Sequence, residues 1–175
     1  MKLSKAYEWL ALEGAPRHLL KALELMGVTE TVGPKHNPII LNWAKEVGLD
    51  NVYKSDEIAW CGLFAAVIMK RADRPVVESP LWALSWANFG VKVDVPMLGD
   101  VLTFKRKGGG HVGLYISEDD TCYHVLGGNQ NNSVNIVRIL KSRLFQARRP
   151  EYTNPPSNIR RIITKNNGKI SENES

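Results

Sequence analysis

Residues 56–70, with the sequence DEIAWCGLFAAVIMK, decide how the rest of the chain is interpreted. An acidic, loop-like start gives way at Cys61 to an unbroken run of good helix formers and apolar residues. The sequence therefore predicts a helix that begins at Cys61. Unpaired backbone N–H groups and the helix dipole favour an anion at that position, so the thiolate form of Cys61 is expected to be stabilised. A thiolate is a competent nucleophile, and a nearby histidine would complete its activation.

Length and composition indicate one soluble domain. The chain has 175 residues, of which 43% are hydrophobic and 23% charged. It contains no long apolar run and no apolar signal-peptide centre at its N-terminus, so we expect synthesis in the cytoplasm and no stable membrane association. The net charge of +5 suits an anionic polymer as partner, either nucleic acid or a cell wall with acidic groups.

The remaining cysteine and histidines give weaker signals. Cys61 and Cys122 are too few for a disulfide scaffold, and no C-x-x-C pair indicates zinc. One bridge between them is an alternative to two free thiols, but the reducing compartment expected here favours free thiols. We expect Cys122 to be structural, and His18 and His36 to lie on the surface.

The first 90 residues are predicted to be mainly helical, because apolar residues recur at helical spacing between glycine and proline breaks. The predicted helices cover residues 5–12, 17–26, 39–47, 61 to 70–72, and 80–89. Trp82 and Trp86 in the last of these are expected in the core, with a sugar-stacking platform as the alternative.

From about residue 91 the pattern changes to short strands. They are predicted at residues 101–104, 111–116, 122–126 and 134–139, with an added edge strand at 144–149. Short turns join them, including a basic hairpin loop at 105–110 and a loop or bulge at 127–133, so we expect an antiparallel sheet. The fold class is therefore α+β. Residues 151–175 are polar and are expected to form a flexible tail.

Four sequence blocks then carry a family resemblance. They are DEIAWCG at 56–62, GDVLTF at 99–104, GGHVGLY at 109–115 and HVLGGNQ at 124–130. In this order they resemble the blocks of the NlpC/P60 and CHAP cysteine hydrolases of the bacterial cell wall, especially the small single-domain branch of phage lysins and prophage genes. The resemblance, which covers about residues 41–150, implies a papain-like α+β fold with N-terminal helices packed on a central antiparallel sheet. It implies one catalytic domain over residues 1–150, with a helical part at 1–90 and a sheet part at 91–150.

The resemblance also implies a set of catalytic residues. Cys61 would be the nucleophile and His111 the general base. Asn129 stands where the family places the polar residue that accepts the other N–H of the imidazole and fixes its tautomer. The chain departs from the pattern at Gly127, where CHAP members often carry a glutamate. His124 is the alternative third residue, because other NlpC/P60 members use a histidine.

Further positions are expected to serve the substrate. The predicted substrate-binding residues are Asp56, Trp60, Gly110 and Gln130. Asp56 would cap the helix or bind a positively charged group of a stem peptide, and glycines 108–110 leave room beside His111 for an extended substrate backbone. The Cys61 backbone N–H would donate to the oxyanion of a tetrahedral intermediate. Basic residues 105–107 are either a solvated hairpin tip or a surface that steers the protein to an anionic wall.

The function predicted by the resemblance is an endolysin-like peptidoglycan hydrolase. It would cut a stem-peptide bond or the sugar–peptide link through a thioester acyl-enzyme, without a metal or other cofactor. The alternatives are a cysteine protease or amidase with another substrate, and a non-catalytic wall-binding module. A nucleic-acid partner is not expected, since the aromatic residues are not interleaved with basic ones. We expect a monomer that reaches the wall through a holin or another export route.

Overall fold

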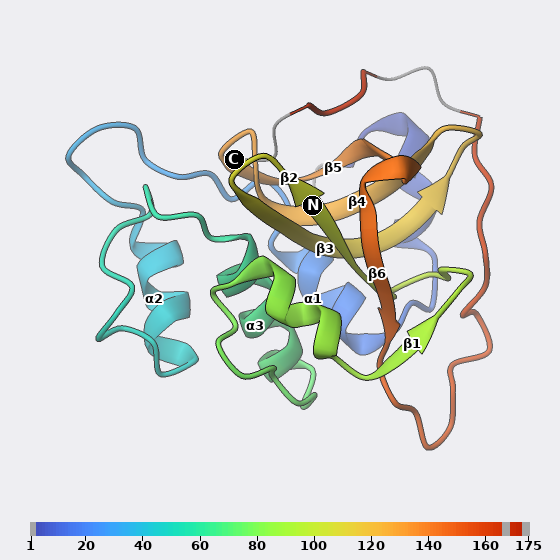
Figure 1. Cartoon of the computed structure of the whole chain (residues 1–175), viewed down its shortest axis with the longest axis horizontal. Coiled ribbons are helices and arrows are strands. Elements are labelled where there is room, and N and C mark those ends of the chain that lie inside the picture. Colours follow the sequence, from blue (N-terminus) through green and yellow to red (C-terminus); the bar gives the residue numbers. More distant parts are fainter. Residues whose placement is uncertain (1–2, 166–168, 173–175) are drawn as a thin grey trace.

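The computed structural model describes residues 3–165 and 169–172, and it has an α+β architecture (Figure 1). The helices are η1 (Lys5–Ala11), α1 (Arg17–Glu24), α2 (Pro38–Glu46), α3 (Cys61–Arg71), η2 (Ala83–Asn88) and η3 (Lys141–Arg143), of which the η elements are 3-10 helices. The strands are β1 (Val91–Val93), β2 (Val101–Arg106), β3 (Gly109–Glu118), β4 (Cys122–Gln130), β5 (Ser133–Leu140) and β6 (Leu144–Arg149). The coarse class expected from the sequence is therefore confirmed.

Helix α3 is the central helix of the fold. It contacts α1, α2, β3 and β4, and it lies between α2 and the sheet in Figure 1. Its first nine residues, Cys61 to Met69, are all buried, which explains why this run is apolar on every side rather than on one face. Burial of these nine residues fixes where the N-terminus of α3, and hence Cys61, meets the sheet.

The six strands form one antiparallel sheet in the order β1-β6-β2-β3-β4-β5. The strand predicted at 144–149 is present as β6, but it is not an edge strand, because it pairs with β1 on one side and β2 on the other. The edge strands are β1 and β5. Strand β1 was not predicted, since three residues are too few to show an alternating pattern.

The sheet is covered on both faces. The larger core includes α3 and the side chains of Val112, Leu114 and Ile116 from β3. A smaller core on the opposite face is built around Phe104 and Tyr115. Alternate residues of one strand thus serve different cores, as the period of a strand requires.

Strand β4 continues through the segment predicted as a loop or bulge. Its pairing with β5 shifts register between Gly127 and Gln130, and Asn129 has a φ of 58°, in the left-handed region. An added Cβ on Gly128 would lie only 2.5 Å from the Cβ of Phe64 on α3. A β-bulge at glycines therefore lets β4 approach the beginning of α3 more closely than a strand with side chains could.

The chain after Pro150 runs beside the sheet, seen in red tones in Figure 1. Glu118 at the end of β3 forms backbone hydrogen bonds with Ile162 and Thr164, and Ile170 bridges to Arg138 on β5. This part of the expected flexible tail is packed, because β3 and β5 offer it backbone partners. Residues 166–168 and 173–175 of the same predicted tail lie outside the described residues.

Three further expectations concern burial. Both cysteines are free and buried. His18, expected on the surface, is fully buried: its helix α1 packs against α3, and its Nε2 lies 2.7 Å from the carbonyl oxygen of Gly99. Trp86 belongs to the core, but Trp82 is 75% exposed. None of the helices formed by the described residues has the length and apolar character needed to span a bilayer.

Candidate active site

Cys61 is the first residue of α3 and is 4% exposed. The backbone N–H groups of Val112 and Gly62 act to lower the pKa of its thiol. Val112 directly follows His111 on β3, so the thiol lies against the strand that carries the predicted base. The structure therefore brings these two segments together, although fifty positions separate them in the sequence.

His111 is 1% exposed, and its Nε2 lies 2.9 Å from Oε1 of Gln130 at the end of β4. The other end of the Gln130 amide fixes its orientation. Its Nε2 donates to the carbonyl oxygens of Val125 and Asn135, at 3.2 and 2.7 Å, and lies 3.0 Å from Oδ1 of Asn135. Because the amide nitrogen faces only acceptors, its oxygen must face the imidazole. His111 Nε2 therefore carries the ring proton, and Nδ1 is the nitrogen that can accept one.

The side chain of Gln130 occupies the place that a side chain at position 127 would take. A Cβ on Gly127 would lie 2.7 Å from Oε1 of Gln130 and 3.1 Å from Nε2 of His111. A residue with a side chain at 127 would therefore exclude the Gln130 amide. The glycine at this position, the one departure from the family pattern, makes room for an orienting group supplied by Gln130.

Asn129 does not make the contact predicted for it, because the β-bulge changes which residue faces the imidazole. Side chains of a regular strand alternate between faces, but a bulge inserts an extra residue and shifts that alternation. Asn129, with its left-handed backbone, is the residue in the bulge, and its neighbour Gln130 makes the hydrogen bond to His111. The third position of the predicted constellation is thus filled by a residue that the sequence had assigned to substrate binding.

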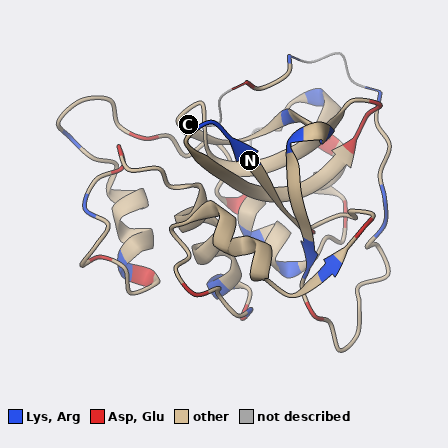
Figure 2. Ribbon diagram, in the orientation of Figure 1, with Lys and Arg blue, Asp and Glu red and all other residues tan. Residues whose placement is uncertain are grey.

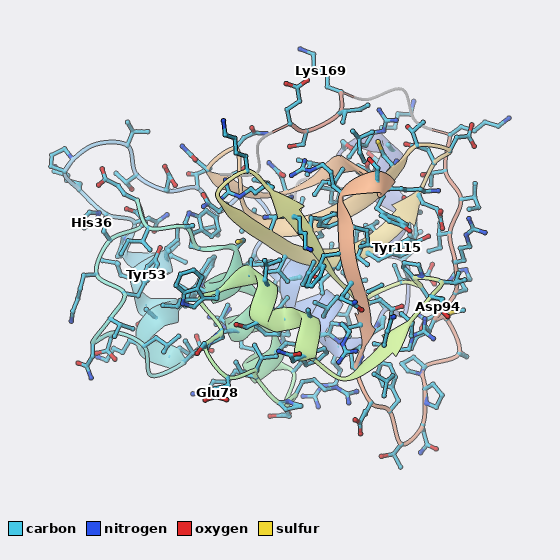
Figure 3. All side chains as sticks on the ribbon, in the orientation of Figure 1. His36, Tyr53, Glu78, Asp94, Tyr115 and Lys169 are labelled. Atoms are coloured by element: carbon cyan, nitrogen blue, oxygen red, sulfur yellow. The ribbon has the colours of Figure 1, made fainter. Side chains whose placement is uncertain are left out.

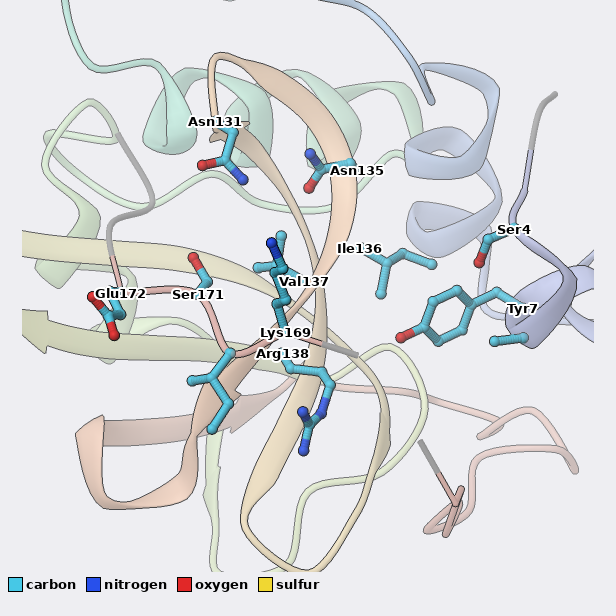
Figure 4. A pocket seen from close by; sticks show the side chains of 12 residues that line it. Ser4, Tyr7, Asn131, Asn135, Ile136, Val137, Arg138, Lys169, Ser171 and Glu172 are labelled. Atoms are coloured by element: carbon cyan, nitrogen blue, oxygen red, sulfur yellow. The ribbon is translucent and has the colours of Figure 1, made fainter. Parts of the chain in front are cut away.

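His124, the alternative third residue, belongs to a separate buried cluster. Its Nδ1 lies 2.9 Å from the hydroxyl of Tyr7, and its Nε2 lies 2.8 Å from Oδ2 of Asp119. Asp119 also accepts a hydrogen bond from Arg138 at 2.7 Å. Burial lowers the pKa of His124, against the raising effect of Asp119. Tyr7 and Arg138 line a cavity of about 760 Å³ beside β5 (Figure 4).

The register of the sheet keeps this cluster away from His111. His124 on β4 is opposite Ser117 on β3, and Ser117 is six positions along the strand from His111. At about 3.3 Å per residue, that separation is roughly 20 Å. His124 therefore cannot orient the imidazole of His111.

The ionisation of Cys61 differs from the expectation drawn from its helix position. Burial raises the pKa of the Cys61 thiol, outweighing the N–H groups of Val112 and Gly62 and the positive charge of Arg106, each of which lowers it. The helix N-terminus therefore acts in the predicted direction but does not prevail over the loss of solvation. A neutral thiol in this position needs a base to remove its proton.

Asp56 is not available for a substrate, because it holds a loop instead. Its carboxylate is fully buried and accepts hydrogen bonds from the backbone N–H groups of Thr31 and Asn37, at 2.9 and 2.8 Å, and from His36 Nδ1 at 2.9 Å. Burial acts to raise the pKa of Asp56, but these hydrogen bonds outweigh it and lower the pKa. His36, expected on the surface, lies in the loop before α2 (Figure 3) and is partly buried by this contact.

The other predicted substrate-binding positions divide between core and rim. Trp60 is fully buried, with its ring 5.9 Å from that of Trp43, so it supports α3 rather than facing solvent. Gly110 is partly exposed beside His111, and an added Cβ there would lie 2.6 Å from Leu84 of η2. Gly110 thus lies at the rim of the site, under a side chain of η2.

The polar centre of the site consists of Cys61, His111 and Gln130. Arg106 is a charged residue at its edge, although the sequence had grouped it with a surface loop. The block HVLGGNQ contains Gln130, but the sequence left open whether residues 127–133 form a loop or a bulge. Among residues 3–165 and 169–172, no group of three or more His, Cys, Asp or Glu side chains is arranged to hold a metal ion. Comparison of the chain with protein-family models, curated proteins and solved structures gave no significant match.

Proposed function

We propose that the protein is a cysteine-dependent hydrolase of amide bonds. Cys61 is the nucleophile, His111 the general base and acid, and Gln130 the residue that orients the imidazole. The observation that carries this proposal is the orientation of the Gln130 amide. Its oxygen accepts a hydrogen bond from His111 Nε2, which leaves Nδ1 of His111 as the proton acceptor. His111 lies on β3, the strand beside the Cys61 thiol. A cysteine that only fills space in a core does not require a neighbouring histidine whose tautomer is fixed by an amide.

The reaction follows from these positions. Nδ1 of His111 takes the proton of the Cys61 thiol as the sulfur attacks the carbonyl carbon of the substrate. The backbone N–H of Cys61, at the start of α3, can donate to the oxyanion that forms. The imidazolium then gives its proton to the leaving amine, and a thioester remains on Cys61. Water, deprotonated by His111, hydrolyses the thioester and restores the thiol.

We propose peptidoglycan as the substrate. The four sequence blocks resemble those of the NlpC/P60 and CHAP wall hydrolases, and the coarse α+β architecture is compatible with the papain-like fold that the resemblance implies. The net charge of +5 favours approach to a wall with acidic groups. The bond cut would be a stem-peptide bond or the sugar–peptide link. In this proposal a monomer made in the cytoplasm acts on the wall after passage through a holin or another export route.

The test is turbidity loss of purified peptidoglycan, followed by mass spectrometry of the released fragments. Wild-type protein should clear the suspension, and Cys61→Ala should lose nearly all turnover. Cys122→Ala is the matched control, because it removes the other buried cysteine and should retain clearing. Fragment masses distinguish endopeptidase from amidase cleavage. Equal clearing by Cys61→Ala, or no clearing by wild-type protein on several wall chemotypes, would contradict the proposal.

A further inference from the structure

A cavity of about 400 Å³ lies between η2 and the strands β1 and β6 at one edge of the sheet. Its walls come from η2, from Lys92 on β1, and from Phe145 and Arg148 on β6. Helix η2 contacts β2, β3 and β6, so it covers this part of the sheet (Figure 1). A cavity of this volume is large enough for a small ligand or for one group of a larger one.

Two basic residues of this cavity repel each other. Lys92 and Arg148 are directly opposite on the antiparallel strands β1 and β6, where Figure 2 shows basic residues side by side. Side chains of opposite residues project from the same face, with Cβ atoms about 4.5–5.5 Å apart, so like charges there are destabilising. Among residues 3–165 and 169–172, no carboxylate forms an ion pair with either of them. The pair therefore costs stability, and a bound anion would offset that cost.

The guanidinium of Arg148 is held in a fixed orientation. Its Nε donates to the carbonyl oxygen of Phe89, directly after η2, at 2.7 Å. This bond uses one of five N–H donors, so the donors on the two terminal nitrogens can serve a ligand in the cavity. A phosphate ester carries a charge of about −1.5 to −2 and three acceptor oxygens. A guanidinium and an ammonium on facing strands suit such a group better than they suit a single carboxylate.

The cavity adjoins the candidate active site. Leu84 of η2 lines the cavity and also lies against Gly110, where an added Cβ would be 2.6 Å from it. Gly110 directly precedes His111 on β3. The residue opposite Gly110 is Lys105, whose Nζ lies 4.2 Å from the ring centroid of Phe145 in the cavity wall. A third positive charge thus lies between the cavity and the site.

We propose that this cavity binds a phosphate ester, with Lys92 and Arg148 as the residues that hold it and Lys105 as a further source of positive charge. The cavity is distinct from the reactive centre at Cys61, so the proposal does not depend on amide hydrolysis. A phosphate carried by a wall polymer would hold that polymer beside the candidate active site, whereas a soluble phosphate ester would occupy the cavity alone.

The first test is isothermal titration with glycerol 2-phosphate and, at equal ionic strength, with acetate. The phosphate ester should bind more tightly. Lys92→Gln and Arg148→Gln should each raise its Kd about tenfold, the effect of losing one hydrogen bond to a charged group. Lys35→Gln removes the same charge from an exposed position in the loop before α2 and should leave Kd close to the wild-type value. Equal binding of the two anions, or an equal loss in Lys35→Gln, would overturn the inference.

Thermal melting distinguishes a binding role of Lys92 from a structural one. Without phosphate and at low ionic strength, Lys92→Gln should melt at or above the wild-type temperature, because it removes the repulsion from Arg148. Glycerol 2-phosphate should raise the melting temperature of the wild type more than that of the variant. A variant that melts lower without phosphate and gains as much from it would contradict the assignment.

The source of the phosphate is decided with Cys61→Ala, which the proposed function predicts cannot digest a wall. This variant should pellet with purified wall that retains its phosphate polymers, and less with the same wall after hydrofluoric acid has removed them. Lys92→Gln in this background should abolish the difference. Pelleting that does not depend on phosphate, together with tight binding of glycerol 2-phosphate, would assign the cavity to a soluble ester. If the wild type hydrolyses no wall, the proposed function fails and these binding results still stand.

Discussion

Replacing Gln130 by alanine should slow the reactions of Cys61 more than replacing the neighbouring Asn129 by glycine. The substitution removes the oxygen that lies 2.9 Å from His111 Nε2, in a site where both side chains are buried. The imidazole proton is then no longer held on Nε2 by this acceptor, and the space left by the Gln130 side chain allows other orientations of the ring. Both changes reduce the fraction of molecules in which Nδ1 can accept the thiol proton.

The size of the effect follows from the burial. A buried N–H that loses its acceptor costs about 1–3 kcal/mol. If this cost appears as loss of the competent imidazole orientation, the rate falls by about 5- to 150-fold. Gln130→Ala also leaves the carbonyl oxygen and Oδ1 of Asn135 without the amide donor, so a lower melting temperature is expected as well. Assays are therefore run well below the melting temperature of each variant.

The matched control is Asn129→Gly. Asn129 has a φ of 58°, which glycine adopts without strain, so this variant removes the side chain and keeps the bulge. It should retain most of the wild-type activity. Alanine would be a poorer control there, because a left-handed backbone costs a residue with a Cβ about 1–2 kcal/mol.

Two assays report the result. One is peptidoglycan turnover, and the other is the pH dependence of iodoacetamide alkylation of Cys61, which requires no substrate. Gln130→Ala should be slow in both, with Asn129→Gly close to wild type. Full activity in Gln130→Ala together with loss of activity in Asn129→Gly would refute this reasoning and return the orienting role to Asn129.

Three other predictions concern stability. Burial lowers the pKa of His18 from 6.5 to about 4, so between these two pH values the unfolded chain binds more protons than the folded protein. The free energy of unfolding should therefore fall by about 3 kcal/mol as the pH is lowered from 6.5 to 4, measured by urea titration. Gly128→Ala places a Cβ 2.5 Å from Phe64 and should lower stability by about 1–3 kcal/mol, measured by thermal melting. His124→Ala should cost about 1–3 kcal/mol and leave Cys61 alkylation unchanged in the folded protein.

Each of these has its own check. His18→Gln should flatten the acid dependence, and an unchanged slope in that variant would assign the effect to other groups. Gly109→Ala is the control for Gly128, since a Cβ there meets no atom within 4 Å; equal losses in both would rule out crowding as the cause. A changed alkylation rate in His124→Ala would contradict the separation of the two histidine clusters.

The parts of the fold that local pattern determines were predictable. The helix begins at Cys61 as expected, because the change from loop-like to apolar helix formers occurs within a few residues. The strands around residues 101–104 and 111–116 follow from their short runs of apolar, β-branched and aromatic residues and the glycine-rich hairpin between them. What the sequence did not reveal is the place of β6 inside the sheet, since pairing between distant strands leaves no local signal.

Two residues of the candidate site, Cys61 and His111, were named from the sequence, and the third residue beside them depends on the bulge. The run Gly127-Gly128-Asn129 is compatible with a loop, a turn or a bulge, and only contact with α3 selects the bulge that presents Gln130. The burial of Asp56 was equally hidden, because its partners come from the loop around Thr31, brought near by folding. Sequence blocks thus identified Cys61 and His111 as candidates, and tertiary contacts decided which side chains surround them.

The packed segment after Pro150 has a consequence for how the chain is assembled. Glu118 is 2% exposed and is held by Arg161 at 2.6 Å and by Lys141 at 2.5 Å, which keep the pKa of its carboxyl near 2. During synthesis from the N-terminus, every strand of the sheet leaves the ribosome before Arg161 does. A nascent chain therefore reaches a stage at which the sheet is complete but the charge of Glu118 lacks one of its cations. Docking of residues 160–164 then supplies that cation. A protein cut at residue 150 would stop at that stage.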